Sequence, residues 1–159
     1  MLPLKIKLLV IGKIKHSYLQ EGIQDYLKRL KHYANAEIVE LPQKRLSSNL
    51  SQNEILRHEY ELFHRQIDSA EYLISLNKEG KVFDSLGFAN ALQAFMNQNR
   101  NRVSFLIGGE LGLSKELLAK SNEVWSFSKF TFTHDMMRLI FLEQLYRAFT
   151  ILAGQKYHK

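Results

Sequence analysis

The chain has 159 residues, enough for one domain that buries roughly 70% of the surface of its unfolded state. It contains no Cys, which excludes disulfide bonds and thiolate metal sites and fits a reducing compartment. The formal net charge is +6, and Lys and Arg outnumber Asp and Glu most clearly in residues 1–45. The apolar run near the amino end is too short for a signal peptide or a membrane span. We therefore expect one cytosolic domain over residues 1–159, with an anionic partner and no membrane contact.

Strand and helix patterns alternate along the whole chain. Short apolar runs predict strands, and apolar stripes at helical spacing predict helices. Their expected places, in chain order, are a strand at 4–11, a helix at 18–32, a strand at 36–41, a helix at 54–67, a strand at 72–76, a helix that Ser85 caps, a strand at 103–107, a short helix, a strand at 124–127 and a long helix from about Asp135. Such alternation implies crossover connections. We expect an α/β fold with a mainly parallel five-stranded sheet and helices on both faces.

Segments between these elements carry further predictions. Residues 43–51 are polar and predict a loop, and residues 77–81 predict a turn after the third strand. The helix at 54–67 is rich in charge, and we expect its hydrophilic face to be solvated. His58 and His64 lie on that helix, so we expect both side chains to contact solvent.

The last third of the chain is the most informative stretch. The strand at 103–107 runs into Gly-Gly-Glu-Leu-Gly at 108–112, and the strand at 124–127 runs into a loop at 128–134. In a parallel sheet such loops lie at the carboxyl ends of strands, where ligands bind. The Gly-rich loop alone lacks the spacing of a dinucleotide site and the lysine of a phosphate loop, and could be only a tight turn. The chain also lacks a carboxylate cluster for the metal of a nucleotide hydrolase.

Several motifs together are far more specific than the Gly-rich loop alone. IGGELGL at 107–113, SFSKFTFTHDMMR at 126–138, EQLYRAF at 143–149 and YHK at 157–159 resemble the SPOUT-class methyltransferases. The closest likeness is to the small family that methylates N(3) of a pseudouridine in 23S ribosomal RNA. KIKLLVIGKIK near the amino end and the helical YLKRL also look like that family, so the resemblance covers essentially the full length.

The resemblance carries implications for fold, chemistry and assembly. It implies a trefoil knot in the C-terminal part of the α/β domain, which nothing in the periodicity of the sequence reveals. It implies S-adenosyl-L-methionine as cofactor, ribosomal RNA of the large subunit as substrate, and a homodimer. Methyl transfer from a sulfonium needs no metal, so we expect no metal site.

The resemblance assigns cofactor binding to three loops. Leu76 ends the third strand, and Gly108 opens the Gly-rich loop. The loop after the last strand supplies the remaining residues, which are Phe127, Ser128, Lys129, Phe130, Thr131 and Phe132. Adenine needs a flat apolar slot and backbone hydrogen-bonding groups, and these loops can offer both. The phenylalanines could instead belong only to the core.

Arg147, Tyr157 and His158 are the expected catalytic and substrate-facing residues. A neutral N(3)–H is a poor nucleophile, so methylation needs a base or cations that stabilise the deprotonated ring. His158 is the preferred proton acceptor, with Arg147 or Lys159 holding a phosphate or the developing anion. An ion pair with Glu143 would explain Arg147 without catalysis, and chain ends are often unordered.

The final helix is apolar on two faces. Phe141 and Leu145 belong to one face, and Met136 and Leu142 belong to the other. One face can cover the sheet of its own subunit, and the second predicts contact with another copy of the chain. Deep burial within one subunit is the alternative.

Basic residues cluster at Lys13 and Lys15 and again at Lys28 and Arg29. We interpret them as contacts for RNA phosphates, although cations near the end of a helix also complement its dipole. A non-catalytic module that binds ribosomal RNA or the ribosome is the second functional hypothesis. The intact loops at 108–112 and 127–133 argue against it.

Two positions depart from the family pattern. Thr133 stands where a proline commonly precedes His134, and a threonine there can still cap the helix. Leu111 occupies a place in the Gly-rich loop where a polar residue is more usual. The second change alters the surface of the loop without removing its backbone groups. We consider His134 chiefly a helix-start residue.

Overall fold

The computed structural model describes residues 3–43 and 49–158. Its strands are β1 (Lys5–Ile11), β2 (Asn35–Leu41), β3 (Tyr72–Val82), β4 (Arg102–Leu106) and β5 (Glu123–Ser126). They form one sheet in the order β2-β1-β4-β3-β5, and every strand pair is parallel. The predicted α/β class and five-stranded sheet are confirmed, and the knot implied by the resemblance stays a prediction. Lys44, Arg45, Lys159 and part of the loop predicted at 43–51 lie outside the described residues.

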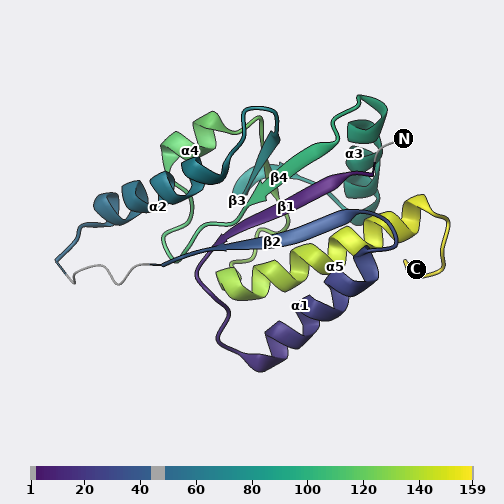
Figure 1. Ribbon diagram of the computed structural model, residues 1–159, viewed down its shortest axis with the longest axis horizontal. Helices are drawn as coiled ribbons and strands as arrows, with labels where there is room; N and C mark the ends of the chain where they lie inside the picture. The colour runs from purple at the N-terminus through teal and green to yellow at the C-terminus, as the bar shows by residue number, and fades with distance from the viewer. Residues whose placement is uncertain (1–2, 44–48, 159) are drawn as a thin grey trace.

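Helices cover both faces of this sheet (Figure 1). The helices α1 (Ser17–Leu30), α3 (Ser85–Asn97) and α5 (His134–Leu152) pack on one face. The helices α2 (Gln52–Gln66) and α4 (Lys115–Lys120) pack on the other. Among the described residues, no helix combines the length and the apolar character needed to cross a membrane.

The strand β1 shows why the sheet needs two covers. Ile6, Leu8 and Val10 belong to the apolar cluster under α1, α3 and α5, whereas Leu9 and Ile11 belong to the cluster under α2 and α4. Successive side chains of a strand point to opposite faces, so a continuous apolar run buries both. This accounts for the run that marked the strand in the sequence.

The predicted turn at 77–81 is wrong, because β3 continues to Val82. Its second half pairs with β5 after a register shift between Leu76 and Lys81. Gly80 permits this approach, since a Cβ there would lie 2.6 Å from the carbonyl carbon of Val124. A polar, Gly-containing segment therefore resembles a turn in sequence while its backbone completes the sheet edge.

Of the two helix caps expected from the sequence, the one on α5 is confirmed and the one on α3 lies one residue earlier than expected. Thr133 Oγ1 accepts a hydrogen bond of 3.1 Å from the backbone N–H of Met136, so the expected cap of α5 is confirmed. The cap of α3 is Asp84, which accepts from the N–H of Gly87 at 2.7 Å. Ser85 was expected in that role and instead donates from Oγ to Gln144 Oε1 at 2.7 Å.

The helix α5 lies between its neighbours and is covered more fully than its two apolar faces suggested. Every residue of α5 is buried or half-buried within the single chain. Leu139 packs closely on α1, where a Cβ at Gly22 would lie 3.0 Å from its Cδ1. The ring of Tyr146 packs on Tyr26 and Tyr33, with centroid distances of 6.0 and 6.1 Å. Part of the second face is thus buried by α1, and the homodimer stays a prediction.

Candidate active site

Most of the predicted site residues line one cavity of about 670 Å³, which lies at the carboxyl ends of β3, β4 and β5. We call it the β3–β5 pocket. All the expected cofactor residues except Lys129 line it, together with Ile107, Leu113, His134 and Met137 from the Gly-rich loop region and α5. A volume of this size falls in the range of small-molecule sites, and the lining mixes apolar side chains with hydroxyls.

The Gly-rich loop folds back on itself to form one wall of this pocket. The N–H of Gly112 donates to the carbonyl of Gly109 at 3.0 Å. A Cβ at Gly108 would lie 2.8 Å from the backbone nitrogen of Leu113 and closer still to the carbonyl of Gly112. The absence of a side chain at Gly108 is therefore required by the loop's own closure, before any ligand is considered.

The loop after β5 forms the facing wall. Ser128 Oγ accepts from the N–H of Phe130 at 2.9 Å, and Ser128 O accepts from Ser126 Oγ at 3.1 Å. These bonds fix the turn of the backbone on which the neighbouring side chains stand. Lys129 points elsewhere: its Nζ donates to the carbonyl of Lys78 at 2.7 Å and joins this loop to β3.

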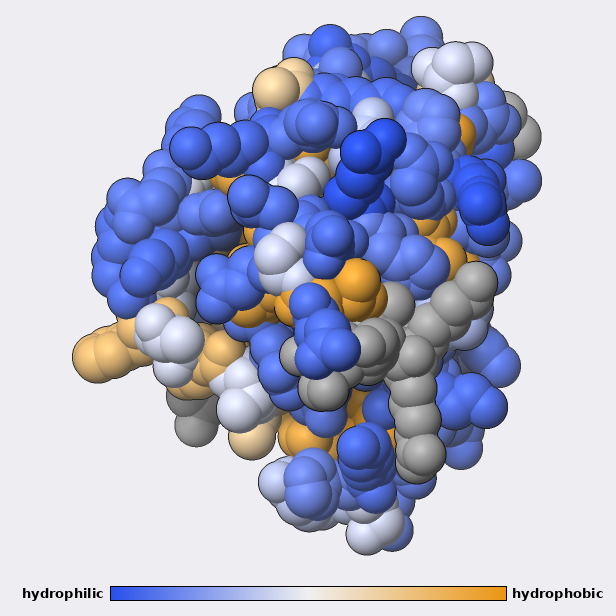
Figure 2. Space-filling model, turned by 90° about the vertical axis from the view of Figure 1, so that its left-hand side faces the viewer, coloured by the Kyte–Doolittle hydropathy of each residue, from blue (hydrophilic) through white to orange (hydrophobic). Residues whose placement is uncertain are grey.

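The phenylalanines of this loop differ from one another. Phe127 is half-buried and packs on Phe88 and Phe141, with ring centroids 5.2 and 5.5 Å away. Phe130 and Phe132 are 81% and 41% exposed, so the interpretation that they belong only to the core is wrong. Figure 2 views the edge of the molecule that holds the carboxyl ends, where apolar residues show between hydrophilic ones. Exposed aromatic rings beside a pocket offer a surface that a flat ligand can cover.

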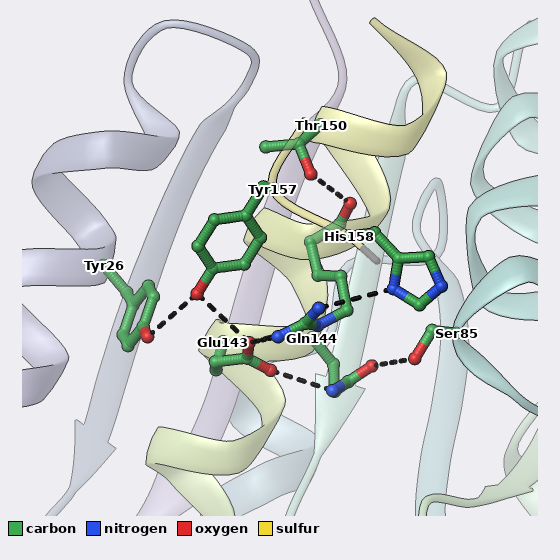
Figure 3. A network of polar contacts seen from close by, with 8 residues as sticks. Tyr26, Ser85, Glu143, Gln144, Thr150, Tyr157 and His158 are labelled. Atoms are coloured by element: carbon green, nitrogen blue, oxygen red, sulfur yellow. Dashed lines mark hydrogen bonds and ion pairs between the residues drawn. The ribbon is translucent and has the colours of Figure 1, made fainter. Parts of the chain in front are cut away.

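The carboxyl-terminal tail is docked against α1 and α5 (Figure 3). Tyr157 Oη donates to Glu143 Oε1 and lies 3.2 Å from Tyr26 Oη. Arg147 Nε donates to the same Glu143 oxygen at 3.1 Å, and its guanidinium lies 4.8 Å from the ring centre of Tyr157. Burial and then the hydrogen bond with Tyr26 raise the pKa of Tyr157. The tail is therefore ordered by contacts that the sequence alone did not predict.

The contacts of Arg147 limit what His158 can do in this arrangement. Arg147 Nη1 lies 3.3 Å from His158 Nδ1. A guanidinium has no acceptor, so Nδ1 accepts and the imidazole is neutral, with its hydrogen on Nε2. The hydrogen bond with Glu143 raises the pKa of Arg147, which stays a cation. As docked, the lone pair of His158 is occupied, and proton transfer to it requires the contact with Arg147 to open.

A single chain does not bring the tail to the β3–β5 pocket. His134 at the start of α5 lines that pocket, and Arg147 lies about 20 Å further along the same helix at about 1.5 Å per residue. Figure 1 shows α5 running from the carboxyl edge of the sheet to its amino edge, with the chain end beyond it. Within one chain, the predicted cofactor loops therefore lie near the start of α5, and the predicted catalytic residues lie near its end.

Comparisons with known proteins identify the family of this chain. A family model described as predicted SPOUT methyltransferase matches residues 4–158. The chain belongs to the SPOUT methyltransferase family. A Bacillus cytotoxicus protein named ribosomal RNA large subunit methyltransferase H is 43% identical over 159 residues, covering 98% of this chain and 100% of the relative. A Bacillus thuringiensis protein of the same name is 44% identical over the same shares.

Solved structures resemble this fold at low sequence identity. A probable methylase family protein from Haemophilus influenzae has a TM-score of 0.56 at 14% identity, covering 97% of this chain and 70% of that one. A putative methyltransferase from Legionella pneumophila, in complex with bound S-adenosylmethionine, has a TM-score of 0.50 at 15% identity, covering 92% and 66%. At these identities the likeness establishes the fold alone.

The two basic clusters predicted from the sequence lie at different places in this SPOUT protein. Lys13 and Lys15 lie after β1 at the carboxyl edge of the sheet, and both are exposed. Lys28 and Arg29 lie at the end of α1, beside Tyr146 and the tail residue Gln155. RNA contact at either place stays a prediction. Among the described residues, no group of three or more His, Cys, Asp or Glu could hold a metal ion.

Arg138 is a buried charged residue that the sequence analysis did not single out. It is 1% exposed, and its guanidinium donates to the carbonyls of Ile11 at 2.6 Å and Gly12 at 2.9 Å. Its nearest carboxylates are Glu40 and Asp135, each 3.5 Å away. Burial lowers the pKa of Arg138, and these carboxylates oppose that shift. An arginine inside an apolar helix was the signal present in the sequence, and it ties α5 to the end of β1.

The solvated face expected for α2 is wrong at two positions. Glu59 is only 6% exposed, and His58 is half-buried with no hydrogen-bond partner for its buried Nε2 among the described residues. His64 is exposed, as expected. A charged helix that packs on a loop hides some of its polar residues, and no sequence pattern distinguishes these from the solvated ones.

Proposed function

We propose that the protein transfers a methyl group from S-adenosyl-L-methionine to N(3) of a pseudouridine in 23S ribosomal RNA, acting in the cytosol where ribosomes are found. The observation that carries the proposal is the convergence of three loops on the β3–β5 pocket. Leu76, Gly108 and the loop from Phe127 to Phe132 come from distant parts of the chain, and the family resemblance had assigned the cofactor to them. The names of the Bacillus relatives support a substrate in the large ribosomal subunit.

The pocket residues would hold the cofactor, which when bound supplies an electrophilic methyl group on a sulfonium. The exposed rings of Phe130 and Phe132 suit a flat adenine, and the loop backbone suits its polar edge. Their task is to orient donor and acceptor in line, since positioning alone contributes several kcal/mol, on the order of 7 or more in favourable cases. Arg147 would stabilise the negative charge that develops on the base as its proton leaves.

A homodimer would join the two halves of the site. The tail of one chain lies about 20 Å from its own β3–β5 pocket, measured along α5 at about 1.5 Å per residue. A two-fold axis near α5 would place the two α5 helices antiparallel. The end of each helix would then lie beside the start of the other, so that the tail of each copy faces the pocket of its partner. Half-buried Met136, Leu139 and Ile140 leave apolar surface on α5 for such a contact.

Methyl transfer is tested directly with purified ribosomal particles. The protein and radiolabelled S-adenosylmethionine should label large subunits from a strain that lacks this enzyme, and mass spectrometry of the ribosomal RNA should locate the methyl group on a pseudouridine. Calorimetry should show cofactor binding by the protein alone. A protein that binds particles but not the cofactor would instead be the non-catalytic module considered from the sequence.

The dimer is tested with mixed subunits. One variant carries Gly108→Ala, which damages the β3–β5 pocket, and the other lacks residues 157–159. If each tail serves the partner's pocket, neither homodimer is active, but the mixed dimer regains one working site. If each tail serves its own pocket, the mixed dimer stays inactive. Sedimentation that finds a stable monomer at micromolar concentration contradicts the dimer itself.

A further inference from the structure

The connection between β1 and α1 carries two stacked rings that the proposed function does not use. The side chains of His16 and Tyr18 lie with their ring centres 5.4 Å apart and their planes 28° from parallel. Both residues are exposed, and the exposed fraction of Tyr18 is 62%. An exposed ring by itself needs no explanation. What distinguishes this one is the stack, which we call the ring pair, and the cations that precede it.

Two exposed lysines stand directly before the ring pair. Lys13 and Lys15 lie on the same connection, and neither forms an ion pair with a described residue. Arg29, in the second basic cluster, is instead paired with Asp25 at 3.2 Å. The charges of Lys13 and Lys15 are therefore available to an anionic partner.

The connection lies at the edge of the sheet that holds the β3–β5 pocket. Gly12 precedes Lys13, and its carbonyl accepts from Arg138, so the connection passes the start of α5 (Figure 1). Only β4 stands between β1 and β3, which puts these strands about 10 Å apart at about 4.8 Å per strand spacing. Nucleotides that flank a base in the β3–β5 pocket can therefore reach the connection.

The Gly-rich loop joins the two places into one surface. Glu110 and Leu111 form the turn of this loop and line the β3–β5 pocket on one side. On its other side they line a second cavity together with Lys13 and Lys15. Leu111 gives the crossing an apolar side chain where the family pattern has a polar one. A strand that leaves the pocket over the outside of the loop meets the two lysines and then the ring pair.

The carboxylates along this path leave the two lysines free. Glu40 accepts from the N–H of Ile14 at 3.3 Å and lies 3.5 Å from the guanidinium of Arg138. Glu59 is buried, and burial raises its pKa. Glu110 is exposed, and no ion pair joins it to either lysine. The lysines can bind phosphates without first breaking an ion pair.

Lysines followed by stacked rings suit an unpaired nucleotide. Lysine binds phosphate as a point charge, and a flat ring accepts the face of any nucleobase. Proteins recognise single-stranded RNA by stacking its unpaired bases on aromatic side chains. A duplex would offer phosphates to the lysines but no free base face to Tyr18. The ring pair thus favours a single-stranded segment.

We propose that Lys13, Lys15 and the ring pair form a subsite for a nucleotide that flanks the methylated base, with its phosphate on the lysines and its base stacked on Tyr18. This inference rests on the proposed function and adds to it the path of the RNA strand on the protein. His16 covers one face of the Tyr18 ring and leaves the other to the base. The subsite holds the substrate equally before and during methyl transfer, so it lowers KM and leaves kcat unchanged.

The test replaces the ring and follows methylation of large ribosomal subunits that lack the methyl group. Tyr18→Ala should lower kcat/KM about 5- to 150-fold, all of it through KM, which is the range for losing one stacked base. Tyr18→Phe keeps the flat ring and should retain the activity of the unaltered protein. Leu86→Ala is the matched control, since it removes a 52% exposed apolar side chain from α3 and should be fully active.

Two further readouts separate stacking from charge and from folding. Tyr18→Ala should weaken the binding of large subunits without changing its salt dependence, whereas Lys15→Gln should reduce the log–log slope by about 0.7 to 0.9. Tyr18→Ala should also melt with the unaltered protein and bind S-adenosylmethionine with the same affinity, because the ring is exposed and does not line the β3–β5 pocket.

The outcomes decide the inference separately from the proposed function. An unchanged KM in Tyr18→Ala, or an equal loss in Tyr18→Phe, overturns the stacking role. A Tyr18→Ala protein that sediments as a monomer where the unaltered protein is a dimer also overturns it, because the ring then belongs to the contact between subunits. If the unaltered protein methylates no particle, the proposed function fails, and affinity for large subunits takes the place of KM. Equal affinities then overturn the subsite, and a weaker affinity of Tyr18→Ala at unchanged salt slope supports it.

Discussion

Replacing the glycines of the Gly-rich loop one at a time separates three kinds of constraint. A Cβ at Gly108 would meet the backbone of Gly112 and Leu113, with the Leu113 nitrogen 2.8 Å away. A Cβ at Gly109 would meet the end of the Glu59 side chain, which can rotate. A Cβ at Gly112 would meet nothing within 4 Å, but the backbone there has a φ of +75°.

The expected costs follow from these contacts. Gly108→Ala forces backbone against backbone, so we expect a loss near the upper end of the overpacking range, about 3 kcal/mol. Gly112→Ala has only the cost of a left-handed conformation, about 1–2 kcal/mol. Gly109→Ala should cost least, because Glu59 moves and gains water. At about 2–4 °C per kcal/mol for a chain of this size, Gly108→Ala should melt about 6–12 °C below the unaltered protein.

Two measurements check the series. Thermal unfolding gives the order of stability, and calorimetry with S-adenosylmethionine gives the affinity of each folded variant. We expect Gly108→Ala to weaken cofactor binding at least about tenfold, since a shift of the loop moves one wall of the β3–β5 pocket. The reasoning is refuted if Gly108→Ala melts with the unaltered protein, or if Gly112→Ala is the more destabilised of the two.

Three further predictions concern the tail, the RNA surface and pH. Deleting residues 157–159 should abolish methylation while leaving cofactor affinity nearly unchanged; a loss of cofactor binding would make the tail a lid over the pocket instead. Lys28→Gln should reduce the salt dependence of ribosome binding by about 0.7 to 0.9 in log–log slope for each phosphate that the lysine neutralises, and Lys115→Gln, exposed on α4, should not. Because burial raises the pKa of Glu59, the folded state holds that proton more tightly than the unfolded state does. The free energy of unfolding therefore falls as pH rises from about 4.3 through the raised pKa, and Glu59→Gln should gain in melting temperature relative to the unaltered protein between about pH 4 and pH 7. The same difference in melting temperature between Glu59→Gln and the unaltered protein at about pH 4 and at about pH 7 would contradict this.

Periodicity predicted β1 and β4 because these strands are buried on both faces and so read as nearly unbroken apolar runs, whereas β2 was predicted from an alternating pattern. It failed at 77–81, where β3 extends through polar residues and Gly80 pairs closely with β5. That pairing depends on backbone contacts with a segment more than 40 residues later, and side-chain pattern carries no information about it. The cap of α5 at Thr133 was local and was predicted correctly.

The contacts of the tail show the same division: those between residues close in sequence were predicted, and those between distant segments were not. Arg147 and Glu143 are four residues apart on one helix, and their ion pair was predicted from this spacing. The contact between Tyr26 and Tyr157 joins the first helix to the chain end and could not be read from either segment. Glu59 was missed because a charged helix looks solvated until the loop that covers it is known.

The strand β1 cannot complete its pairing in the sheet until β4, which is about 100 residues later in the chain, is available. It pairs with β2 on one side and with β4 on the other, where Lys5 stands opposite Arg102. Until β4 has been synthesised, one edge of an almost wholly apolar strand has no partner and can pair with another nascent chain. Closing so long a loop delays the parallel pairing that completes the sheet. We therefore expect the return of the second half of the chain to its amino-terminal strand to be a slow step of folding.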